Sequence, residues 1–148
     1  MTWVHHSIFA AGGERLPEDW QAFAAQTGAR AVLHQRPGAP ARFEGLPPEA
    51  FLWLNLEDER QAGLEERRLA AGFIADSLAR GRRVLLHGSL GRHRIRWAFV
   101  AYRIYSGRGT RAALREAAAR PWLSPYPTDT AAWEAFEAAL RAQPEEEG

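Results

Sequence analysis

The residues best suited to chemistry lie in the segment HGSLGRHR (87–94), directly after the apolar run VLL. An apolar strand, a glycine-containing loop and a helix in that order present several backbone N–H groups and the positive end of the helix to one anion. Arg94, at the end of the loop, can donate two parallel hydrogen bonds to phosphate oxygens. Gly91 permits the tight curl that turns successive amides inward. The segment therefore predicts an oxyanion site of phosphate size; the alternative is a plain strand-to-helix turn with surface arginines.

The segment resembles the signature of the cysteine-dependent protein tyrosine and dual-specificity phosphatases, in which His, Cys, two residues, Gly, two residues and Arg follow an apolar strand. His87, Gly91 and Arg94 are in register, whereas Gly88 stands at the position of the cysteine. The similarity covers nearly the whole chain. It includes the opening strand and helix (5–36), the segment FLWLNLEDE (51–59) and the helices on either side of the loop.

The resemblance implies a role for each residue of the loop. Arg94 would bind phosphate and His87 would order the loop, although a histidine there could equally be a buried core residue. Asp58, which is 30 residues before Gly88 and follows the apolar run FLWLNL, matches the general acid; an exposed loop carboxylate is the alternative. The expected phosphate-binding residues, which would offer their amides as a cradle, are Ser89, Leu90, Gly91, Arg92, His93 and Arg94.

Two positions depart from the family pattern, and both affect the covalent step. Gly88 has no side chain, and Ile95 replaces the hydroxyl residue that usually follows the arginine. The chain has no cysteine and all 19 of its basic residues are arginine, so thiol and lysine nucleophiles are excluded. The pattern predicts a catalytically disabled phosphatase-like domain, or pseudophosphatase, that binds a phosphate or a phosphorylated ligand such as a phosphoprotein and uses no cofactor.

Two other functions stay open at this stage. One is a phosphatase-related hydrolase that uses His93 or an activated water, because Ser89 has no evident base to activate it. The other is an interaction protein in which the loop is vestigial and a surface patch binds a macromolecule. We do not expect that macromolecule to be nucleic acid, because Trp20, Trp53, Trp97 and Trp133 fall on predicted core faces; Trp122 stays open. His5, His6 and His34 do not predict a metal site, because adjacent strand residues face opposite sides.

The elements that must position the loop alternate between strand and helix. Apolar runs predict strands at 3–9, 30–36, 51–56 and 83–87. Helical periodicity predicts helices at 16–28, 64–81, 95–105, 110–120 and 128–142. The predicted fold is α/β: a dual-specificity-phosphatase-like, mostly parallel sheet of four to five strands with helices on both faces. We expect one domain over residues 1–143 and a flexible acidic tail at 144–148.

The charge is uneven along the chain, although the net charge is only +1. Residues 77–115 contain ten arginines and no acidic residue, which predicts a positive face that attracts anions. The arginine bias and the many alanines are typical of a bacterial-like, GC-rich genome. The sequence shows no apolar run long enough to span a membrane and no signal peptide at its start, so we expect a cytoplasmic location.

Overall fold

The protein is described by a computed structural model that covers residues 2–13, 16–43, 45–120 and 126–142. Its centre is a five-stranded sheet in the order β1-β2-β5-β3-β4. Strands β2 (Ile8–Gly12), β5 (Arg83–Gly88), β3 (Ala29–Gln35) and β4 (Ala50–Leu54) are parallel, and β1 (Thr2–His5) is antiparallel to β2. The predicted α/β class and mostly parallel sheet are confirmed.

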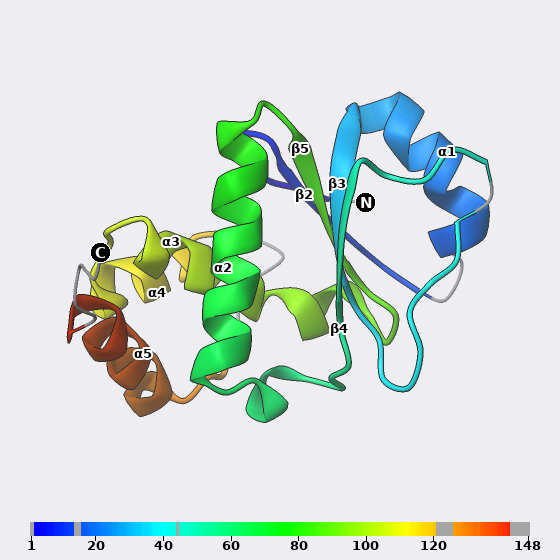
Figure 1. Ribbon diagram of the computed structural model, residues 1–148. Coiled ribbons are helices and arrows are strands. Elements are labelled where there is room, and N and C mark those ends of the chain that lie inside the picture. The colour runs from blue at the N-terminus through cyan, green and yellow to red at the C-terminus, as the bar shows by residue number, and fades with distance from the viewer. Residues whose placement is uncertain (1, 14–15, 44, 121–125, 143–148) are drawn as a thin grey trace.

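Helices cover both faces of the sheet, as predicted (Figure 1). Helix α1 (Leu16–Thr27) lies alone on one face. The other face carries α2 (Leu64–Ala79), α3 (Trp97–Tyr105), α4 (Thr110–Ala118) and α5 (Thr130–Ala142). Two short 3₁₀ helices, η1 (Glu59–Gln61) and η2 (Arg92–Ile95), lie in the connections after β4 and β5. No helix in the described ranges is long and apolar enough to cross a membrane.

The two faces of the sheet bury separate cores. The larger core includes Trp97, Phe99 and Trp133 and lies under α2 to α5. The smaller core lies under α1 and includes Trp20. Trp20, Trp97 and Trp133 are therefore core residues as predicted, whereas Trp53 is only half-buried and donates its indole N–H to the Arg36 carbonyl. Trp122 and the acidic tail at 144–148 lie outside the described residues.

Two predicted elements are divided in the structure. The segment predicted as one strand at 3–9 folds into β1 and β2, because His6 adopts a positive φ of 45° and reverses the chain. The helix predicted to begin at Ile95 begins at Trp97, because residues 92–95 first form the tighter turn η2. This turn sets the direction in which the loop after β5 leaves the sheet.

The end of β2 contacts the loop after β5 closely and restricts its conformation. Gly12 pairs with Gly88 in the ladder, and Gly13 donates its N–H to the Gly88 carbonyl at 3.1 Å. A Cβ on Gly12 would lie 2.7 Å from the Gly91 carbonyl carbon and 2.8 Å from its Cα. Real Cβ atoms essentially never approach other atoms this closely, so only glycine fits at position 12 with the loop as it stands.

We therefore predict that Gly12→Ala lowers the free energy of unfolding by about 1–3 kcal/mol, the usual cost of overpacking against backbone. Gly72→Ala is the matched control. Its added Cβ would make ordinary contacts with the Tyr105 side chain, at 3.7 Å from the hydroxyl and 4.0 Å from Cζ, and would stabilise the helix by up to about 1 kcal/mol. Urea unfolding of both variants checks this, and a Gly12→Ala protein as stable as the wild type would contradict it.

Candidate functional site

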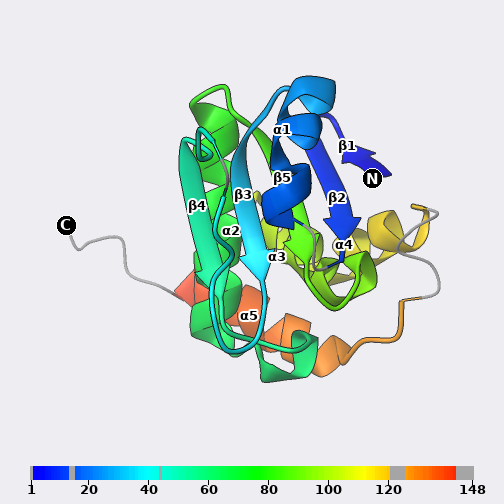
Figure 2. The ribbon, with the colours of Figure 1, turned by 90° about the vertical axis from the view of Figure 1, so that its right-hand side faces the viewer.

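The loop after β5 lies at the carboxyl ends of the parallel strands, where α/β sheets bind their ligands. The arrowheads of β2 and β3 point to this end of the molecule, toward α5 (Figure 2). The segment after β4, which contains Asp58, reaches the same end. The fold thus gathers the loop 88–94 and the predicted general-acid position, which are far apart in sequence.

A pocket of about 720 Å³ opens at this end. Its walls come from η1, from the N-terminal part of α2, from η2 and from the segment that leads into α5. Three predicted site residues line it: Asp58, His93 and Arg94. The other predicted residues lie outside its lining; they are His87, Gly88, Ser89, Leu90, Gly91 and Arg92.

The position of the family's nucleophile is closed in this structure. A Cβ on Gly88 would fall well under 3.0 Å from the Gly91 carbonyl oxygen, with the Ile95 Cβ at 3.6 Å on the other side. Gly91 turns its carbonyl there by adopting φ 128° and ψ 149°, a region open essentially to glycine alone. Position 88 therefore has neither a side chain nor the space for one while Gly91 keeps this conformation.

Three of the amides expected to form the cradle donate to carbonyl groups within the protein. Ser89 N–H donates to the Gln35 carbonyl, Gly91 N–H to the Gly88 carbonyl and Arg94 N–H to the Gly91 carbonyl, each at 3.0 Å. The Ser89 hydroxyl is buried without a hydrogen-bond partner, so no base activates it. The group that this loop offers to an anion is chiefly the Arg94 side chain, which is 46% exposed.

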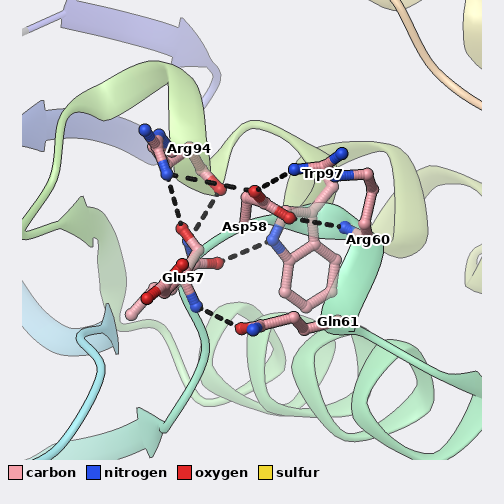
Figure 3. A network of polar contacts seen from close by, with 7 residues as sticks. Glu57, Asp58, Arg60, Gln61, Arg94 and Trp97 are labelled. Atoms are coloured by element: carbon pink, nitrogen blue, oxygen red, sulfur yellow. Dashed lines mark hydrogen bonds and ion pairs between the residues drawn. The ribbon is translucent and has the colours of Figure 1, made fainter.

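A buried amide that sequence reasoning missed holds these segments together; Figure 3 labels the three residues that it joins, Glu57, Arg94 and Trp97. Gln35, at the end of β3, is 2% exposed. Its Nε2 donates to the Glu57 carbonyl at 3.0 Å and to the Arg94 carbonyl at 2.9 Å, and its Oε1 accepts from Trp97 Nε1 at 2.7 Å. A glutamine at the end of a buried strand was the one signal in the sequence that could have found it.

Asp58 is a helix cap and an arginine partner in this arrangement. Its Oδ1 accepts from the Arg60 N–H at 3.0 Å, and its Oδ2 lies 3.3 Å from Arg60 Nη2 and 3.9 Å from Arg94 Nη1. The hydrogen bonds from Arg60 hold the pKa of Asp58 below its usual range. Asp58 is therefore ionised at neutral pH, whereas a general acid must hold a proton.

His87 pairs with a second buried histidine. Its Nδ1 lies 3.1 Å from Nδ1 of His34 on the neighbouring strand, and the two rings are stacked. Burial and the mutual proximity lower the pKa of His87 to about 3. Burial and Arg36 lower the pKa of His34 to about 4. Both rings are therefore neutral at pH 7, and one donates its Nδ1 proton to the other.

No metal centre is evident in the part of the chain that the structure describes. No three His, Cys, Asp or Glu side chains gather there closely enough to hold a metal ion. His5 and His6 have rings in contact, with centroids 4.2 Å apart, whereas His34 packs against His87.

No protein-family model matches the chain, and no curated protein matches it in sequence. Solved structures do match it. Human DUSP28 is 22% identical, with a TM-score of 0.70 over 97% of this chain and 99% of that one. A mouse putative dual specificity phosphatase complexed with zinc tungstate is 18% identical, with a TM-score of 0.72 over 97% and 92%. A human tyrosine phosphatase-like serine/threonine/tyrosine-interacting protein is 19% identical, with a TM-score of 0.71 over 96% and 95%. The chain therefore has the fold of the dual-specificity phosphatases.

The His34–His87 pair predicts a loss of stability in weak acid. Because both pKa values are lower in the folded protein than the usual 6.5, the unfolded chain binds more protons below pH 6.5. The contribution of the two neutral histidines to the free energy of unfolding is fully present above about pH 6.5. It falls as the pH drops toward 4, by up to about 1.4 kcal/mol per pH unit for each histidine.

Urea unfolding at pH 7, 6 and 5 measures this slope. We expect the double variant His34→Gln/His87→Gln to show a shallower slope than the wild type. His6→Asn, at an exposed position, should change the slope less, because it acts only through its contact with His5. Equal slopes in the wild type and the double variant would show that the pair does not control the acid response.

Proposed function

We propose that this protein, which has the dual-specificity phosphatase fold, is a catalytically disabled domain that binds a phosphate or a phosphorylated ligand in the pocket beside Arg94. One observation carries the proposal. The Gly91 carbonyl fills the space above Gly88, while the Arg94 guanidinium remains half-exposed on the wall of a pocket. Position 88 therefore provides no nucleophile, whereas the Arg94 guanidinium is available to bind an anion.

The covalent step of a cysteine-dependent phosphatase lacks the groups it needs at the matching positions of this chain. Attack on phosphorus requires a nucleophile that is ionised or has a base beside it, and neither Gly88 nor the buried Ser89 hydroxyl meets that requirement. Asp58 is ionised, so it has no proton to give a leaving group. Ile95 is fully buried and offers no hydroxyl.

The binding step keeps favourable electrostatics. The pocket lining contains four arginines and His93 against three acidic residues. One of those acids, Glu59, already accepts hydrogen bonds from the Tyr126 and Thr128 hydroxyls. Arg94 contacts the Glu57 carbonyl at 3.4 Å and Asp58 at 3.9 Å, which are long distances for such contacts. A phosphate would offer Arg94 shorter, bidentate hydrogen bonds.

The names of two structural neighbours support the proposal that the pocket binds a phosphate or a phosphorylated ligand. The mouse protein is complexed with zinc tungstate, and tungstate is a tetrahedral oxyanion like phosphate. The human tyrosine phosphatase-like protein is named for interaction with serine, threonine and tyrosine. We therefore favour a phosphorylated partner, such as a phosphoprotein, over a metabolite that is turned over.

Thermal unfolding in rising concentrations of phosphate, sulfate, tungstate and chloride tests the proposal. A ligand that binds only the folded state at 100 times its Kd stabilises it by about 2.7 kcal/mol. For a domain of this size that raises the Tm by roughly 5–10 °C. We expect this rise with the three tetrahedral oxyanions but not with chloride.

Arg94→Ala should lose the rise, whereas Arg68→Ala should keep it. Arg68 is exposed on α2 outside the pocket lining, so its variant removes the same charge from a different surface. Equal stabilisation of the wild type and Arg94→Ala would show that the anion binds elsewhere. Salt-dependent retention on nucleic acid that survives Arg94→Ala would instead favour an interaction surface with a vestigial loop.

A further inference from the structure

A second arginine of the same pocket is buried, which is unusual for a charged side chain. Arg67, in the first turn of α2, is 4% exposed and lines the pocket. Its guanidinium lies 4.1 Å from the centre of the Trp133 ring, which is itself fully buried. Its Nε donates to the Ala62 carbonyl at 3.0 Å, and its Nη2 donates to the Glu59 carbonyl at 3.5 Å.

This buried cation has no counter-charge in the part of the chain that the structure describes. Its hydrogen-bond acceptors are backbone carbonyls, and its Nη1 is buried without any partner. The carboxylate of Glu59 is bonded to Tyr126 and Thr128 instead. Burying a charge without a partner costs several kcal/mol, and each unsatisfied buried donor adds to that cost. The cation–π contact with Trp133 offsets part of that cost, but it leaves Nη1 without a hydrogen-bond partner.

We propose that Arg67 forms a second anion subsite on the inner wall of the pocket. This inference rests on the proposed function and deepens it: the ligand carries two anionic groups, a phosphate beside Arg94 and a second phosphate or carboxylate that faces Arg67. Direct contact with Nη1, which is covered in the ligand-free protein, would require a small shift of the wall.

Isothermal titration with phosphate, pyrophosphate and tripolyphosphate tests the subsite, because this series increases the span between anionic groups. For the wild type we expect the best polyphosphate to bind about tenfold or more tightly than phosphate, since a hydrogen bond to a charged group contributes about 1.5–3 kcal/mol. Arg67→Met keeps the apolar contact with Trp133 and removes the charge. It should abolish this gain while phosphate itself binds within about threefold of the wild type.

Arg68→Met is the matched control, because it removes one arginine from the next position of the same helix but from outside the pocket. It should keep the gain. If Arg67→Met fails to fold, Arg67→Gln provides a neutral side chain that retains a donor. In the wild type, the Arg67 Nε resonance, assigned through its contact with Trp133, should shift with polyphosphate and not with phosphate.

The outcomes distinguish a failure of the second subsite at Arg67 from a failure of phosphate binding beside Arg94. If no oxyanion binds the wild type, the proposed function fails. If phosphate binds in an Arg94-dependent way but the polyphosphates gain nothing, or their gain survives in Arg67→Met or Arg67→Gln, the second subsite alone is overturned. A gain that is lost equally in Arg68→Met would reflect general charge and would also overturn it.

Discussion

The candidate site depends on one buried amide, the side chain of Gln35. Its three polar contacts join the end of β3 to the backbone of Glu57, the backbone of Arg94 and the indole of Trp97. The Trp97 indole N–H is buried, so losing its bond to Gln35 would cost about 1–3 kcal/mol. Because Gln35 also accepts the Ser89 N–H at its backbone carbonyl, one residue sets both the start and the end of the loop. The pocket forms where these tethered segments meet α2 and α5.

Under the proposed function, the same contacts allow a chain with the phosphatase fold to keep a place for an anion without a catalytic loop. With no side chain at Gly88, the Gly91 peptide is free to turn its carbonyl into the vacated space, and the loop closes on itself. Gln35 and the Gly91 carbonyl both bind the backbone of Arg94, at its carbonyl and its N–H respectively. The guanidinium therefore still faces the pocket, where Arg67 provides a second and more deeply buried positive charge. Under the proposed function, the loop contributes to a binding site and provides no catalytic group.

Local sequence patterns predicted the strands and helices, because these depend mainly on neighbouring residues. The apolar run before His87 predicted a strand at 83–87, and helical periodicity predicted a helix at 64–81; both are seen, as β5 and α2. The sequence did not show the contacts that define the site, because they join distant residues. Gln35 and Trp97 are 62 positions apart, and His34 and His87 are 53 apart. The direction of the Gly91 carbonyl was also hidden, because glycine permits many backbone conformations.

The central claim is that the protein binds a phosphorylated group without cleaving it, and ³¹P NMR of phenyl phosphate mixed with the protein tests both halves in one sample. The account predicts that the phenyl phosphate signal broadens or shifts as protein is added, that Arg94→Ala removes this effect, and that no inorganic phosphate accumulates over many hours. A growing inorganic phosphate signal, or a phosphohistidine signal that disappears in His93→Ala, would show that the protein is an enzyme and would contradict the account.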